Sequence, residues 1–195
     1  MKCCDNNNRP PTGRGNEALM HFQLHRSIDV LARTPGVVYE LLSGIDDAWS
    51  RATEGPDTFS PFDVVGHLID GEETDWMARA RIIRAGANET FAPYDRFRHR
   101  VRNAGRDLPS LLEEFATLRF VNLEELRSWQ LTERDLVMTA THPSFGSVTM
   151  RQLLSTWVVH DLGHIAQITR VMAKQYKEEI GPWAAFLPVV TDRSS

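Results

Sequence analysis

The feature that most constrains the fold is a long helical pattern over residues 149–177, in which apolar residues recur every three or four positions. Thr149, followed by Gln152 three residues later, matches a capping box and marks the start of this helix. At 100° per residue, one face of such a helix must be buried against other elements. Two histidines lie on that face, which consists of Leu153, Trp157, His160, His164, Ile168 and Val171.

Three further segments carry helical patterns. Thr34-Pro35 and Ser60-Pro61 each put an N-cap residue before a proline at the first helical position. A third segment begins near residue 108 and keeps leucine and phenylalanine on one face. The predicted helices cover about residues 35–45, 61–85 and 108–130.

The segments between these helices complete the predicted organisation. Residues 21–32 fit either an extra helix or an ordered arm, and residues 141–148 are typical of a turn. Residues 87–107 form a long polar connection, which is uncommon unless it is functional or mobile. Residues 183–190 are apolar and are predicted to dock on the helices. Four amphipathic helices without alternating strand patterns predict an all-α four-helix bundle. The predicted divisions are a disordered N-terminal arm (1–20), a single domain (21–190) and a tail (191–195).

Composition excludes several classes of function. The net charge of −4 argues against bulk electrostatic binding to nucleic acid or to an anionic membrane. The N-terminus lacks the apolar centre of a signal peptide, so we expect a cytoplasmic protein. Cys3 and Cys4 are adjacent and no later cysteine can pair with them, which excludes a disulfide framework. A metal or lipid role for this pair is an alternative to its lying in a disordered tail.

The two histidines of the last helix have two interpretations. His160 and His164 are spaced i, i+4, which suits either buried core residues or shared ligation of a metal ion. His67, inside the second helix, is the best candidate for a third ligand. Gly71 follows one turn later and indicates that another group approaches closely there. Three imidazoles on two helices would leave coordination positions open, as in catalytic sites.

Two aspartates and an arginine are candidates for catalytic roles. Asp161 lies within HDLGH, which resembles the metalloprotease pattern H-E-x-x-H with a shorter carboxylate. Asp161 and Asp70 are interpreted as possible bases, as acceptors that orient an imidazole, or as structural residues. Arg96 belongs to a series of five arginines between residues 96 and 106. These arginines either pair with carboxylates such as Glu113 and Glu114 or hold a substrate carboxylate or phosphate.

The chain resembles the DinB-like superfamily of metal-binding four-helix bundles from about Ile28 to Leu187. The resemblance implies an up-down-down-up bundle with a long connection between its second and third helices. It also implies that His67, His160 and His164 bind a divalent metal and that the protein is a homodimer. Imidazole suits zinc, nickel, iron and copper alike. The metal that we expect is zinc or nickel, with iron or manganese as alternatives. The matching segments are SPFDVVGHLIDGEETDW (60–76), FAPYDRFR (91–98), LLEEFATLRFVNLEEL (111–126), THPSFGSVTMRQLLSTWVVHDLGHIAQITRVMAKQY (141–176) and GPWAAFL (181–187).

The resemblance also implies that the protein is an enzyme. Characterised relatives include thiol S-transferases that use bacillithiol or mycothiol, and a thiol-dependent maleylpyruvate isomerase. We therefore expect a metal-dependent thiol S-transferase acting on small electrophilic molecules, with a low-molecular-weight thiol as co-substrate and no nucleic-acid or membrane partner. The alternatives are a metal-dependent hydrolase of the same fold, a non-catalytic metal- or ligand-binding dimeric bundle, and a helical protein with buried histidines.

Overall fold

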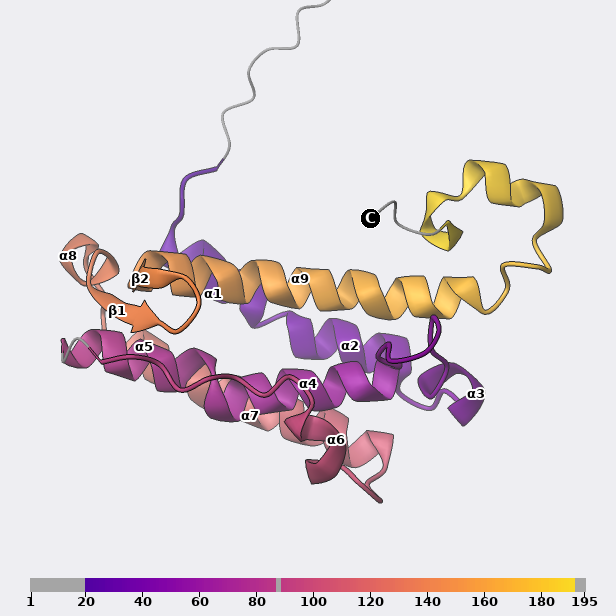
Figure 1. Cartoon of the computed structure of the whole chain (residues 1–195), viewed down its shortest axis with the longest axis horizontal. Helices are drawn as coiled ribbons and strands as arrows, with labels where there is room; N and C mark the ends of the chain where they lie inside the picture. Colours follow the sequence, from indigo (N-terminus) through magenta and orange to yellow (C-terminus); the bar gives the residue numbers. More distant parts are fainter. Residues whose placement is uncertain (1–19, 87–88, 192–195) are drawn as a thin grey trace, which may run out of the picture.

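The computed structural model describes residues 20–86 and 89–191, and these form a four-helix bundle (Figure 1). Each of the first two bundle helices is broken into two parts. Short helices lie in the connections, and two 3-10 segments lie at the C-terminal end. The bundle helices are α1 (Leu24–Leu31) with α2 (Thr34–Leu42), α4 (Pro61–Thr74) with α5 (Trp76–Ala85), α7 (Leu108–Ser128) and α9 (Met150–Lys174), and the short ones are α3 (Asp47–Ser50), α6 (Arg98–Arg102) and α8 (Glu133–Leu136).

The direction of the helices confirms the predicted topology. In Figure 1, α1 and α2 run one way, α4 with α5 and then α7 run the opposite way, and α9 returns in the first direction. Two consecutive helices can run parallel only if a long connection returns along the bundle. The segment between α5 and α7 is that connection, and it contains α6. The all-α, up-down-down-up bundle expected from the sequence is therefore confirmed.

Local signals account for most helix starts. Ser60 and Asp63 form a capping box at α4, and Thr149 and Gln152 form another at α9. The prediction that Thr34 is an N-cap is wrong. Thr34 is already the first residue of α2 and is buried, because α1 runs into α2 through a short turn whose backbone is helical. The extra helix considered for residues 21–32 is present as α1.

A break between α4 and α5 corrects the prediction of one continuous helix over residues 61–85. At Asp75, the one residue between α4 and α5, the backbone departs from ideal helical angles, with φ −113° and ψ −74°. The break turns the indole of Trp76 back against Gly71, where a Cβ atom would lie 3.0 Å from the indole nitrogen. Gly71 therefore makes room for Trp76, which stacks on Trp157 of α9 with ring centroids 5.8 Å apart.

The segment predicted to be a turn, residues 141–148, lies in a small β-hairpin. The prediction of a bundle without strands is therefore wrong at this point. Strands β1 (Thr139–His142) and β2 (Gly146–Thr149) are antiparallel, with Ala140 opposite Val148. Each strand has four residues, too few for an alternating pattern to stand out in the sequence. The hairpin also fixes the long connection, because the backbone N–H of Phe91 donates to the carbonyl of Thr141.

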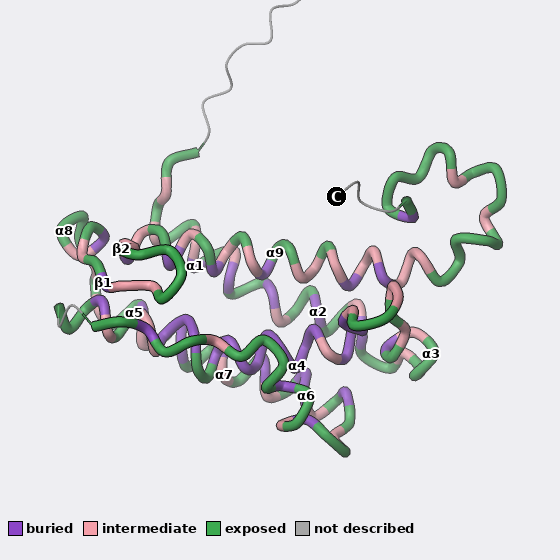
Figure 2. Tube along the Cα trace, viewed as in Figure 1, coloured by how far each residue is buried: buried purple, intermediate pink, exposed green. Residues whose placement is uncertain are grey.

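The core consists of two apolar clusters, and the histidines lie between them. In α9, Trp157 belongs to the cluster under the hairpin, and Ile168 belongs to the cluster around α2, α4 and α7. His160 and His164 fall between these two positions. Figure 2 shows the buried residues along the facing sides of α4, α5 and α9. The sequence thus interrupts its apolar core with imidazoles at one level of the bundle.

The ends of the chain contribute little to the core. The tail forms two 3-10 segments, Gly181–Phe186 and Pro188–Val190, and only Val190 is buried. Trp183 and Phe186 are 69% and 78% exposed, so the predicted docking of residues 183–190 is largely wrong. Cys3 and Cys4 lie outside the described residues, and the domain limits stay predictions. Across the described part of the chain, every helix is too short or too polar to cross a membrane.

Candidate metal centre

Three histidines from two helices converge on one point. His67 comes from α4, and His160 and His164 come from successive turns of α9. The Nε2 atom of His160 lies 3.2 Å from Nε2 of His67 and 3.0 Å from Nε2 of His164. Ligand atoms of all three residues lie within 4.8 Å of one another. The structure therefore brings together the three residues that the sequence singles out as ligands.

The donor set fits a divalent metal ion. Nδ1 of His164 donates to Oε1 of Gln167 at 2.9 Å, and Nδ1 of His67 lies 3.1 Å from the hydroxyl of Tyr94. With a proton on each Nδ1, every Nε2 would carry a lone pair, and Nε2 of His160 lies about 3 Å from the other two Nε2 atoms. An ion bound at about 2.0–2.1 Å to each nitrogen would give similar separations and remove the repulsion.

Burial keeps the imidazoles of His67 and His164 neutral. Burial lowers the pKa of His67 to about 2, with a further contribution from the neighbouring histidines. Burial also lowers the pKa of His164 to about 4, assisted by His160. A neutral imidazole is the form that binds metal. His67 and His164 are therefore held in their ligand form across the physiological pH range.

Behind His160 lies a closed group of buried charges, here called the ionic core: Glu72, Arg119 and Asp161. Oδ1 of Asp161 is 3.8 Å from Nδ1 of His160. Arg119 donates to Asp161 at 2.6 Å, to Glu72 at 2.6 Å and to the carbonyl of Leu31 at 2.7 Å. Burial alone would raise the pKa of Asp161, but the charge of Arg119 holds that pKa below its usual value.

Sequence reasoning missed Arg119, although a signal for it was present. Arg119 comes four residues after Phe115 and four before Leu123, so it lies on the buried face of α7. An arginine on such a face requires a buried carboxylate. Asp161, on the buried side of α9, meets that need.

Behind His67 lies a loop instead of a helix. Tyr94, whose hydroxyl faces His67, belongs to the long connection between α5 and α7. Burial, followed by the charge of Asp70, raises the pKa of Tyr94. Asp70 is fully buried and forms an ion pair with Arg98 of α6. Asp70 therefore lies behind Tyr94 and does not touch the three histidines directly.

A cleft of about 360 Å³ opens beside the cluster, and we call it the histidine cleft. Arg96 lines it, whereas the two aspartates that the sequence suggested as bases, Asp161 and Asp70, do not. The carboxylate that lines the cleft belongs to Asp75, which the sequence analysis did not single out. The lining residues are Phe59, His67, Asp75, Tyr94, Arg96, His160, His164 and Gln167.

Comparisons with known proteins agree with this architecture. The sequence profile of the DinB superfamily matches residues 31–168, well over half of the chain. Among solved structures, the chain is similar to YfiT from Bacillus subtilis, described as a probable metal-dependent hydrolase with an unusual four-helix bundle topology. The two share 20% identity with a TM-score of 0.67, over 86% of this chain and 93% of that one. No curated protein matches the chain in sequence. The chain belongs to the DinB superfamily.

Proposed function

We propose that this protein is an enzyme that depends on a divalent metal ion bound by His67, His160 and His164. The observation that carries the proposal is the convergence of three imidazoles beside an open cleft. Zinc or nickel suits such a donor set best, with iron or manganese as alternatives. When bound, the ion would supply a Lewis acid that lowers the pKa of a thiol or water at its open position.

The reaction that we propose first is transfer of a low-molecular-weight thiol to a small electrophilic molecule. The thiol loses its proton, its sulfur forms a bond with an electrophilic carbon, and the leaving group departs with its electron pair. Asp75 is the carboxylate that lines the cleft, and burial raises its pKa, so it is suited to accept that proton. Asp161 and Asp70 would position the ligands His160 and His67.

A hydrolase is the second candidate. The structural similarity to YfiT, itself described as a probable metal-dependent hydrolase, favours it. Water would then replace the thiol as nucleophile, and Asp75 would accept the proton of that water. We further propose that the protein is cytoplasmic and, following the family resemblance, that it forms a homodimer. Sedimentation of the purified protein would test the homodimer.

The first experiment is elemental analysis of protein purified without chelators. We expect about one divalent ion per chain, and replacing His67 or His164 with glutamine should lower that content at least tenfold. The matched control is His25→Gln, because His25 is an exposed histidine on α1. A metal content below about 0.1 per chain in the wild type would overturn the proposed site.

The second experiment uses the same sample with panels of thiols, electrophiles and esters. Chelator-sensitive conjugation of a thiol would support the transferase. Ester hydrolysis without conjugation would favour the hydrolase. A fully loaded protein that turns over neither class would indicate a metal- or ligand-binding bundle without catalysis.

A further inference from the structure

The arginines of the long connection fall into two groups. Arg98, Arg102 and Arg106 each form ion pairs with carboxylates of α4 or α7, and Glu114, one of the partners expected from the sequence, binds two of them. Within residues 20–86 and 89–191, neither Arg96 nor Arg100 pairs with a carboxylate. No carboxylate of the described residues therefore offsets the charge of these two arginines.

Aromatic rings position both of the unpaired arginines. The guanidinium of Arg96 lies 5.5 Å from the ring centre of Phe59 and 4.9 Å from that of Phe97. The guanidinium of Arg100 lies 5.6 Å and 4.8 Å from the same two rings. Such cation–π contacts orient a guanidinium without occupying its hydrogen-bond donors. Both side chains are exposed, so these donors are free to bind a ligand.

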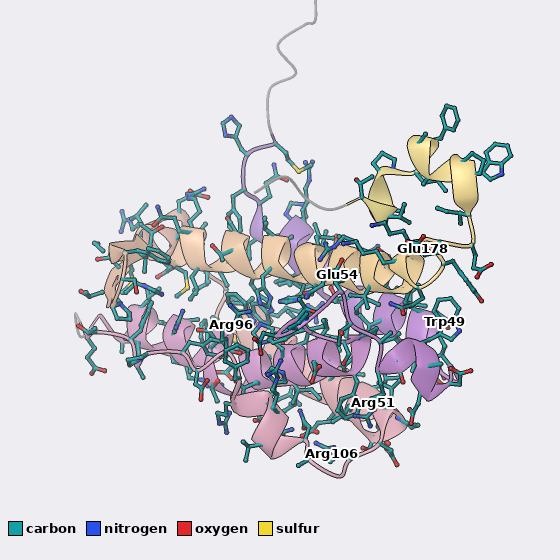
Figure 3. All side chains as sticks on the ribbon, turned by 45° about the vertical axis from the view of Figure 1, so that its right-hand side comes forward. Trp49, Arg51, Glu54, Arg96, Arg106 and Glu178 are labelled. Atoms are coloured by element: carbon teal, nitrogen blue, oxygen red, sulfur yellow. The ribbon has the colours of Figure 1, made fainter. Side chains whose placement is uncertain are left out.

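Only one of the two arginines faces the histidine cleft. Arg96 lines it together with the three histidines, and Arg100 does not. Figure 3 shows Arg96 between the ribbons of α4 and α9, well apart from Arg51 and Arg106. The other charged side chain of the cleft, Asp75, is already paired with Arg79 at 2.5 Å.

We propose that Arg96 binds the carboxylate of the substrate and that the protein acts on small organic monoacids. A guanidinium offers two parallel N–H donors that match a carboxylate. One unpaired guanidinium neutralises one negative charge, which favours a carboxylate over a phosphate dianion. A cleft of about 360 Å³, walled by Phe59 and Tyr94, suits a small molecule with an apolar body. This inference rests on the proposed function for the reaction that follows binding.

Calorimetric titration with a matched pair of probes tests this inference. The probes are 3-phenylpropanoate and its uncharged amide, titrated into zinc-loaded wild type, Arg96→Gln, Arg96→Lys and Arg100→Gln. We expect the wild type to bind the acid about tenfold more tightly than the amide. Arg96→Gln should lose most of this preference, Arg96→Lys should keep part of it, and Arg100→Gln should keep it whole.

Two results would overturn the assignment to Arg96. One is an equal loss of preference in Arg96→Gln and Arg100→Gln, which would indicate a general effect of positive charge. The other is failure of the wild type to bind the acid more tightly than the amide. The Arg100→Gln control is stringent because Arg100 shares both aromatic contacts of Arg96.

Metal analysis of every variant separates this inference from the proposed function. If the protein takes up no metal but shows a carboxylate preference that depends on Arg96, the anion site is supported and the metal enzyme is contradicted. A metal-loaded protein without that preference would contradict the anion site alone. Arg96 is not one of the three proposed metal ligands, so the Arg96→Gln variant should retain its metal. Loss of metal in this variant would show that Arg96 acts on the histidines instead of the substrate.

Discussion

The two flanks of the histidine cluster support similar ligands in opposite ways. On the α7 flank, His160 is backed by the ionic core, whose Arg119, Glu72 and Asp161 side chains are at most 2% exposed. On the loop flank, His67 is backed by Tyr94 and then by Asp70, whose partner Arg98 is 47% exposed. One support is built into the core of the bundle, and the other belongs to a connection that water reaches.

This difference separates the contributions to folding from those to binding. Charges in a closed core are strongly coupled, and removing one partner leaves the others unpaired and away from water. Charges at a surface are screened, and each pair contributes little to stability. We therefore expect changes in the ionic core to cost stability and ligand geometry together, and changes on the loop flank to alter mainly what the cleft binds.

The largest effect is expected from Arg119→Met. Two buried carboxylates would lose their shared partner, so the free energy of unfolding should fall by about 3–5 kcal/mol. The matched control is Arg106→Met on the long connection, because Glu114 keeps Arg102 as a second partner, and it should cost about 1 kcal/mol or less. Urea unfolding measures the loss of stability in both variants. An equal loss in the two would contradict the idea that the buried charges contribute more to stability than the charges of the connection.

Acid sensitivity of the metal-free protein should come next. The pKa of His67 is about 2 in the folded state and 6.5 in an unfolded chain, and that of His164 is also lowered. The unfolded state therefore binds more protons below pH 6.5, and stability should fall as pH drops through that value. Each histidine should contribute about 1 kcal/mol per pH unit.

Unfolding of chelator-treated protein between pH 7 and pH 5 measures this slope. His67→Gln should reduce the slope of the unfolding free energy against pH by the contribution of one histidine. His25→Gln, which removes an exposed histidine, should leave that slope unchanged. A slope that stays the same in His67→Gln would contradict the burial of His67 on the loop flank.

A smaller effect, on metal affinity, should distinguish the two aspartates. Asp161→Asn keeps the shape of the side chain but removes the charge that faces Nδ1 of His160. We expect metal affinity to fall by about 10–100-fold, as for other groups that orient a ligand. Asp70→Asn should have a weaker effect, because Tyr94 lies between Asp70 and His67. Competition with a chromophoric chelator measures both, and a reversed order would show that the loop flank holds the metal.

Much of the fold follows from local signals in the sequence. Capping boxes mark the starts of α4 and α9, and the i, i+4 spacing puts His160 and His164 on one face. A single histidine inside α4 then suffices to suggest a third ligand. These features depend on residues close in the chain, where helical geometry is fixed.

What the sequence did not predict depends on contacts between distant segments. Arg119 meets Asp161 42 residues later in the chain, and no periodicity identifies that partner. Asp75 lines the cleft at the break between α4 and α5, where the sequence pattern predicts a continuous helix. Arg96 lines the histidine cleft, whereas Arg98, two residues later, pairs with Asp70, and the path of the connection decides this difference.

The smallest effect is expected from Tyr94→Phe. The variant removes a hydroxyl 3.1 Å from Nδ1 of His67 but keeps the ring, whose centroid lies 5.7 Å from that of His67. Since α4 and the ring of Phe59 also orient His67, metal affinity should fall by less than about tenfold. Tyr39→Phe on α2 is the control, because Tyr39 is half exposed and does not line the histidine cleft. A larger loss for Tyr94→Phe than for Asp161→Asn would mean that the loop positions the metal ligands, and closure of the connection would then control metal binding.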